Sequence, residues 1–217
     1  VTAKNVHIDG SITASGGDEF VEYSNGTATL YGGGSGGSIY ITASLTFTGR
    51  GTLKATGGNG YGGGGGGRVA VALKVPSGYH GAFDTSGGSS RAGQWSNSGR
   101  SFVGYVDVSD KVSHGGPGTG FMTELRSGYE YTSLHVGNGG LVGPSLDLDT
   151  VADDNNVLAF NELRLSDFAY FEPLKNTTVA LFLSDQTTKF IVTDNVFASL
   201  EESNPSFFHP STSFEVS

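Results

Sequence analysis

Apolar and polar residues alternate along most of this chain, in short segments separated by glycine, serine and asparagine. Such alternation places every second side chain on one face, which is the pattern of a half-buried β-strand. Apolar stripes with a 3.6-residue period are missing, and glycine, threonine, serine and valine disfavour helix. The pattern predicts an all-β chain with strands at residues 6–12, 38–42, 45–53, 69–75, 102–108, 132–136, 157–165, 179–183 and 189–193.

A glycine-rich repeat is superimposed on this alternation. The segment GGGSGGSIYITA begins at Gly32, and the similar segment GGGGGGRVAVAL begins at Gly62. A second element recurs as GSITASGG from Gly10, GTLKATGG from Gly51 and GAFDTSGG from Gly81. Each repeat is expected to form a unit that buries its apolar face by stacking on the next. We expect the paired glycines to form turns with positive φ, or sites without room for a side chain, in a parallel β-helix.

The order of these motifs resembles a glycine-rich repeat family of secreted and cell-surface proteins. Its members occur in bacteria and in some protists, and include proteins of tubular flagellar hairs (mastigonemes). A GGGSGGSI segment, a G-x-I-x-A-x-GG segment and a GGGGGGRI segment follow one another in that family, as similar segments do within residues 32–73. Further similarities begin at His114 (HGGPGTGF), Tyr131 (YTSLHVGNGG) and Phe160 (FNEL). The resemblance covers about residues 1–185; it implies a right-handed parallel β-helix outside the cell, and no catalytic residues.

The repeat pattern ends after about Asp185. Residues 186–217 contain two prolines and many polar residues, which interrupt strands. We therefore predict a β-helix domain over 1–185. Residues 186–217 would form a terminal cap, or an arm that contacts another subunit through Phe207 and Phe208.

Charge and composition exclude several classes of partner. The chain of 217 residues has a formal net charge of −9 and no cluster of lysine or arginine, whereas nucleic-acid binding requires grouped cations. No apolar run approaches the ~20 residues of a membrane helix, and the absence of cysteine excludes disulfides. Glycosylation sequons at Asn25 and Asn176 agree with secretion. We expect an extracellular or cell-surface protein that has no nucleic-acid partner and does not insert this segment into a membrane.

The densest acidic patch is a candidate metal site. Hard cations take several oxygen ligands, and Ca²⁺ could find them at Asp147, Asp149, Asp153 and Asp154. The spacing does not match the D-x-[DN]-x-[DN]-G loop, so a solvated loop is the alternative. No other cofactor is expected.

Residues that could carry catalysis are scattered. The carboxylates that could form the pair needed for glycoside hydrolysis are Asp84, Asp107, Asp110, Glu124 and Glu130. Aromatic residues offer a second possibility, because they can stack on sugar rings or fill a core or a subunit contact. These residues are Tyr61, Tyr79, Trp95 and Tyr105.

Together these features predict a non-enzymatic structural protein. It would form part of a fibre, a surface appendage or a cell-surface coat by stacking and lateral packing with copies of itself or other subunits. The expected subunit contacts are Gly62, Gly63, Gly64, Gly65, Gly66, Gly67, Trp95, Phe207 and Phe208. An adhesin or glycan-binding module is the first alternative. A polysaccharide lyase or hydrolase is the second, and it would need two carboxylates, or a carboxylate and a cation, converging in a groove.

Overall fold

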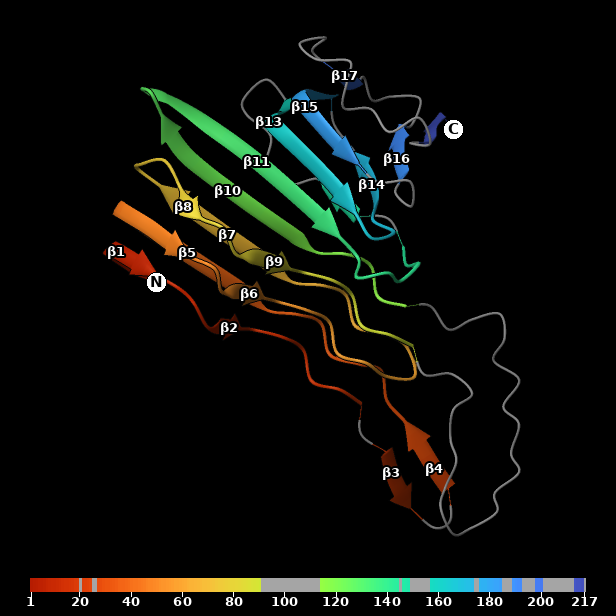
Figure 1. Ribbon diagram of the computed structural model, residues 1–217. Coiled ribbons are helices and arrows are strands. Elements are labelled where there is room, and N and C mark those ends of the chain that lie inside the picture. The colour runs from red at the N-terminus through yellow and green to blue at the C-terminus, as the bar shows by residue number, and fades with distance from the viewer. Residues whose placement is uncertain are drawn as a thin grey trace.

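The computed structural model describes residues 1–19, 21–24, 27–90, 114–144, 146–148, 157–173, 176–184, 189–192, 198–200 and 213–216, and their regular structure is entirely β-strand (Figure 1). The strands are β1 (Thr2–His7), β2 (Ser11–Thr13), β3 (Val21–Ser24), β4 (Thr27–Leu30), β5 (Ser38–Gly49), β6 (Thr52–Lys54), β7 (Arg68–Leu73), β8 (Gly78–Tyr79), β9 (Ala82–Asp84), β10 (Thr119–Arg126), β11 (Tyr129–Gly137), β12 (Leu146–Leu148), β13 (Val157–Ser166), β14 (Tyr170–Pro173), β15 (Asn176–Ser184), β16 (Lys189–Val192), β17 (Ala198–Leu200) and β18 (Ser213–Val216).

The main sheet is mixed. Its strand order is β1-β5-β7-β10-β11-β13-β15-β17, with β8 beside β5. Neighbouring strands are parallel on both sides of the β10–β11 pair, which is antiparallel. A second antiparallel pair joins β3 to β4. The prediction of a right-handed parallel β-helix is therefore wrong: the chain forms a mixed sheet of two parallel blocks that run in opposite directions.

A two-residue turn causes the reversal. Arg126 pairs with Tyr129 across Ser127 and Gly128, whose φ angles are 47° and 88°. Two consecutive positive φ angles characterise the type I′ turn, which joins antiparallel strands with the correct twist. A hairpin at this position is incompatible with a uniformly parallel stack.

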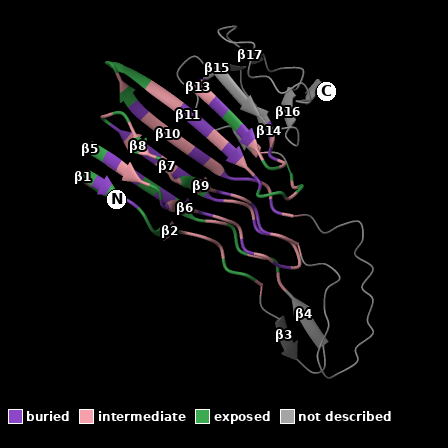
Figure 2. Cartoon of the chain, in the orientation of Figure 1, coloured by how far each residue is buried: buried purple, intermediate pink, exposed green. Residues whose placement is uncertain are grey.

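The main sheet carries a hydrophobic core on each face. Ile41, Phe47 and Val71 pack with Leu53 of the small sheet β2-β6-β9 in the first core. The second core lies between β11 and β13 of the main sheet and the sheet β12-β14-β16-β18, and contains Leu134, Val136, Leu163, Leu165 and Phe171. The buried positions alternate along the strands in Figure 2.

The two cores face opposite ways. Met122 of β10 packs against the first core, and the adjacent Phe121 packs against the second. Successive residues of a strand point to opposite faces. Connections between parallel strands of one sheet are nearly always right-handed. Successive strands continue to add to the same edge of the main sheet, but their direction reverses at the β10–β11 hairpin. Right-handed connections therefore cross one face of the sheet before the hairpin and the opposite face after it.

Several strands differ from their predicted bounds. The predicted strand at 6–12 is divided between β1 and β2 by a bend at Asp9 and Gly10. The predicted strands at 38–42 and 45–53 are a single long strand, β5, followed by β6. The predicted strand at 102–108 lies outside the described residues.

Candidate functional site

The glycine repeats build a double layer of extended segments beyond the strands. We call residues 14–19, 55–60 and 85–90, which follow β2, β6 and β9, the outgoing segments. Residues 31–37, 61–67 and 114–118, which precede β5, β7 and β10, are the returning segments. Both sets leave the sheets side by side in Figure 1, and together they form the glycine double layer.

Backbone hydrogen bonds cross between the two layers in a continuous series. The N–H of Gly34 donates to the carbonyl of Gly17 (2.9 Å), and Gly58 donates to Gly34 (2.8 Å). Gly64 then donates to Gly58 (2.9 Å), Gly88 to Gly64 (2.7 Å) and Gly115 to Gly88 (2.9 Å). Other bonds run within each layer, for example from Gly33 to Gly62 and from Gly16 to Thr56. The network satisfies backbone groups that an interior without side chains would otherwise leave unpaired.

Residues 61–67 show why this network requires glycine. A Cβ on Gly64 or Gly67 would collide with the backbone of residues 33–37, and a Cβ on Gly63 or Gly66 would collide with the segments near residues 85–88 and 115–118. A Cβ on Gly62 or Gly65 would meet nothing within 4 Å. This directional pattern repeats every three residues, which is the period of a polyproline II helix.

These contacts change the interpretation of the glycines. The paired glycines Gly16-Gly17, Gly57-Gly58 and Gly87-Gly88 lie in extended segments, and none of them has a positive φ, so the expected turn conformation is wrong there. Lack of room is the actual constraint at Gly16, Gly57, Gly58, Gly87 and Gly88. Among the predicted subunit contacts Gly62 to Gly67, contacts within the chain account for Gly63, Gly64, Gly66 and Gly67. Only Gly62 and Gly65 remain open.

Polar side chains form rows across the outgoing segments. Asp18 Oδ1 accepts hydrogen bonds from the backbone N–H (2.8 Å) and Nδ2 (3.1 Å) of Asn59, whose Oδ1 in turn accepts from the N–H of Ser89 (2.9 Å). A parallel row begins where the hydroxyl of Thr56 donates to Ser15 Oγ (2.9 Å). The similar repeat sequences thus place matching polar residues side by side and tie each repeat to the next.

Asn138 joins the glycine double layer to the second parallel block. Its side chain is fully buried, and its Oδ1 accepts from the N–H of Gly87 (2.9 Å). Its Nδ2 donates to the carbonyls of Gly115 (3.2 Å) and Leu141 (2.6 Å). A buried amide satisfied in this way fixes the position of the chain that carries it.

A group of polar and charged side chains lies on β10, β11 and β13 of the main sheet. Glu124 is 2% exposed, and its carboxylate accepts hydrogen bonds from the N–H of Ser77 and from the guanidinium of Arg126. The Arg126 guanidinium lies 3.5 Å from the centroid of the Tyr131 ring. The Tyr131 hydroxyl donates to Glu162 Oε2 (3.1 Å). We call this connected set, together with His135 and Arg164, the polar sheet face.

The polar sheet face leads into a groove of about 450 Å³. Asp84 and Ser86 line one side, and His135 and Arg164 line the other. Arg164 donates to Glu162 Oε1 (2.9 Å), which lies 3.9 Å from His135 Nε2. Burial lowers the pKa of His135, the charge of Arg164 lowers it further, and Glu162 opposes both. The imidazole is therefore neutral at neutral pH.

The polar sheet face satisfies its own charges. Glu124 and Glu162 each contact an arginine, and Glu162 also accepts the tyrosine hydroxyl. Of the predicted carboxylate candidates, Glu124 is the buried one, and Asp84 forms an ion pair with Lys54 (3.5 Å). Glu130 is exposed, and Asp107 and Asp110 lie outside the described residues. The sequence analysis did not single out Glu162. The alternation in FNELRL was the available signal, because it places Glu162 on the strand face opposite to that of the buried Leu163.

The predicted aromatic platform is not assembled by the described residues. The Tyr79 ring packs in the first core, 4.8 Å from Phe47 and 6.1 Å from Phe83, and its hydroxyl donates to the Gly51 carbonyl (2.7 Å). Tyr61 is partly buried, and Trp95 and Tyr105 lie outside the described residues. Among the described residues, the main sheet exposes Tyr40 of β5, which is 58% exposed, and Tyr129 at the start of β11, which is 53% exposed. The position of Tyr40 between the buried Ile39 and Ile41 was the sequence signal that could have identified it.

The remaining predicted sites fall mostly on residues that the structure leaves undescribed. Asp147 lies in β12, whereas Asp149, Asp153 and Asp154 are outside the described residues, and no metal-binding group of histidine, aspartate or glutamate occurs among those described. Asn176 begins β15, and Asn25, Phe207 and Phe208 are outside the described residues. In the 186–217 segment, β16 and β17 pair with β14 and β15, and β18 pairs with β16.

Comparison with family models, curated proteins and solved structures gives no match to this chain. The described part of the chain also contains no helix with the length and apolar character needed to cross a membrane.

Proposed function

We propose that this chain is a non-enzymatic structural module of an extracellular assembly, such as a fibre, a surface appendage or a cell-surface coat. The observation that supports the proposal most directly is the glycine double layer, in which backbone hydrogen bonds link all six segments. A region built from backbone contacts has little side-chain entropy to lose on packing, which suits a rigid element used in repeated contacts.

The open glycines support contacts with other molecules. Neither crowding nor a positive φ accounts for Gly62 and Gly65, and both lie on a returning segment. A glycine there allows the backbone of another subunit to approach closely. A second copy of the chain is the natural partner, because its own glycine double layer presents the same side-chain-free backbone.

The chemistry of the rest of the chain is consistent with this role. Charged residues make up 15% of the sequence, and the net charge is −9. The buried Glu124 and the nearby Glu162 are neutralised by arginines. The resemblance to the glycine-rich family of secreted and cell-surface proteins supports the extracellular location.

Self-association of the purified chain tests the proposal. We expect sedimentation velocity to show oligomers that increase with protein concentration, and electron micrographs to show particles with a regular repeat. The double variant G62V/G65V should reduce association, because valine at these open positions holds two backbones apart. The control G10V also places a side chain in open space, outside the glycine double layer, and should associate like the wild type.

A chain that remains monomeric at every concentration would contradict the proposed assembly. Equal association of G62V/G65V and wild type would show that these glycines do not form the contact. Circular dichroism of each variant confirms that the fold is retained.

A further inference from the structure

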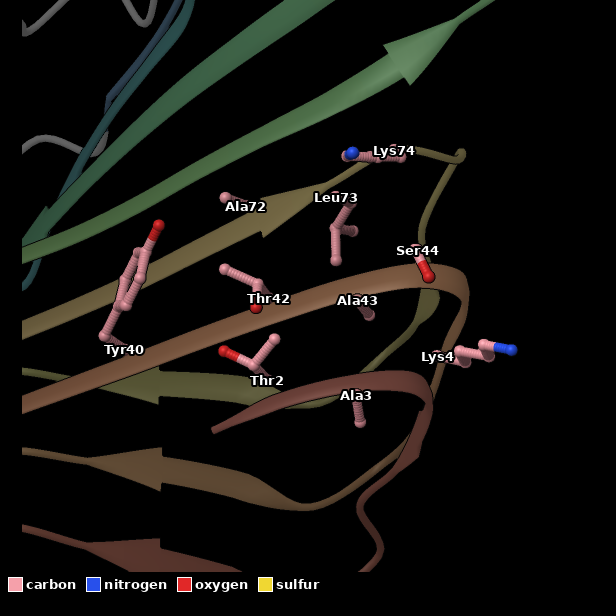
Figure 3. A pocket seen from close by; sticks show the side chains of 10 residues that line it. All are labelled: Thr2, Ala3, Lys4, Tyr40, Thr42, Ala43, Ser44, Ala72, Leu73 and Lys74. Atoms are coloured by element: carbon pink, nitrogen blue, oxygen red, sulfur yellow. The ribbon is translucent and has the colours of Figure 1, made fainter.

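A groove on the outer part of the main sheet lies where β1, β5 and β7 run side by side (Figure 3). Thr2 pairs with Thr42, and Thr42 pairs with Ala72, so the three strands are in register across it. The pairing of β1 with β5 shifts between Ala3 and Asn5, at Lys4. Such a shift bends a strand and re-aims its side chains. The groove has a volume of about 680 Å³ and is called here the lysine groove.

The charge of the lysine groove is opposite to that of the chain. Its only charged lining residues are Lys4 and Lys74, and both are exposed. Neither forms an ion pair with a described residue, in contrast to Lys54, which pairs with Asp84. Two lysines with no acidic neighbour in the lining make the lysine groove locally positive in a chain with net charge −9, and a positive groove favours an anionic ligand.

The other side chains of the lysine groove suit a sugar. Tyr40 lies at the end away from the lysines and is 58% exposed. An exposed ring of this kind offers an apolar face and a polar hydroxyl. The hydroxyl of Thr42 is buried and has no hydrogen-bond partner among the described residues, although a buried hydroxyl normally has one. Hydroxyls of Thr2 and Ser44 line the same groove.

We propose that the lysine groove binds an acidic polysaccharide. A sugar ring lies on Tyr40, sugar hydroxyls hydrogen-bond to the accessible hydroxyls of Thr2 and Ser44, and carboxylate or sulfate groups farther along the polysaccharide pair with Lys4 and Lys74. A nucleic acid fits less well, because two lysines neutralise only two phosphates while the rest of the protein is negative. The inference goes beyond the proposed structural role and connects the module to an acidic extracellular matrix.

Binding is measured by isothermal titration calorimetry with three probes: oligogalacturonate, which is carboxylated, dextran sulfate and neutral dextran. The protein concentration is kept where sedimentation shows a monomer, so the result does not depend on the proposed assembly. We expect at least one anionic probe to bind, neutral dextran not to bind, and binding to weaken when salt is raised. Preference for one anionic probe identifies the acidic group.

Matched variants locate the site. K4Q/K74Q should weaken binding of the anionic probe at least tenfold, and Y40A about fivefold or more. The control K54Q removes a lysine that is already paired with Asp84, and Y129A removes a tyrosine that is 53% exposed at the β10–β11 hairpin, so each should bind within twofold of the wild type. Failure of both anionic probes to bind, equal binding of neutral dextran, or unchanged binding by K4Q/K74Q would each overturn the proposal.

Discussion

Two adjacent glycines provide the sharpest test of the glycine double layer. A Cβ added to Gly64 would lie 2.5 Å from the carbonyl carbon of Gly34 and closer still to its oxygen, whereas a Cβ added to Gly65 would meet nothing within 4 Å. Neither residue has a φ in the left-handed region, so alanine is conformationally acceptable at both. The pair G64A and G65A therefore compares one methyl group in two environments that are a single residue apart.

The structure gives the size of each effect. In G64A the two segments must move apart, which disturbs the bonds from Gly64 to Gly58 and from Gly88 to Gly64. Each lost hydrogen bond costs about 0.5–1.5 kcal/mol, and forcing a methyl group into a packed interior costs about 1–3 kcal/mol. G64A should thus destabilise the fold by about 2–6 kcal/mol. G65A should stabilise it by about 0.4–1 kcal/mol, because alanine restricts the unfolded chain.

Thermal unfolding followed by circular dichroism distinguishes these outcomes. In a chain of this size, 1 kcal/mol changes Tm by about 2–4 °C. We expect Tm to fall by roughly 5–20 °C in G64A and to rise by roughly 1–4 °C in G65A. Urea unfolding provides a second measure of the same free energies. Equal stability of the two variants would refute the three-residue directional pattern, and with it the close packing of the segments.

Two further predictions concern the polar anchors. N138A leaves the buried N–H of Gly87 and the carbonyls of Gly115 and Leu141 without their partner, so urea unfolding should show that the free energy of unfolding falls by about 2–5 kcal/mol. The control N5A removes an exposed hydrogen bond to Thr46 and should change this free energy by less than about 0.5 kcal/mol. The pKa of His135 is lowered in the fold, chiefly by burial, so the unfolded chain binds the proton more tightly and stability should decrease as pH falls below 6.5. The urea midpoint should therefore decrease less between pH 7.5 and pH 5 in H135Q than in the wild type, while the exposed control H80Q behaves like the wild type; an unchanged pH dependence in H135Q would contradict this assignment.

The sequence was sufficient to locate β5 and β7 of the first parallel block and β11, β13 and β15 of the second. The alternation in SIYITA and RVAVAL matches the buried positions Ile39, Ile41, Val69 and Val71. Repeats with the same pattern pair in register, as β2, β6 and β9 do. Local periodicity is informative here because every repeat supplies the same apolar face to the same core.

The reversal at the hairpin was harder to predict. No strand was predicted at Thr119–Arg126, where the buried position 124 holds a glutamate and not an apolar residue. The dipeptide Ser127-Gly128 was a usable signal, since a two-residue loop that contains glycine is compatible with a hairpin. The glycine-rich repeats, however, predict parallel stacking, and this short signal was not enough to overrule them. The position of Glu124 depends on Arg126 and Ser77, and contacts of this kind cannot be inferred from periodicity.

The glycines Gly62 to Gly67 have different environments that the sequence alone does not distinguish. Six consecutive glycines, Gly62 to Gly67, look identical in sequence, yet their environments repeat with a period of three. A polyproline II segment with neighbours on two of its three sides needs glycine at two positions of every three, and the third position is free to vary. In the returning segment 31–37, Ser35 is exposed at the position equivalent to Gly65, whereas Gly33, Gly34 and Gly36 occupy crowded positions. Gly115 and Gly118 of the segment 114–118 are crowded as well. Ser35 thus marks the open side of its segment, and no contact or backbone angle within the described part of the chain requires glycine at Gly62 or Gly65 on that side. The subunit contact proposed above would account for glycine at these two positions, which is why the G62V/G65V variant tests the assembly and the G64A variant tests the fold.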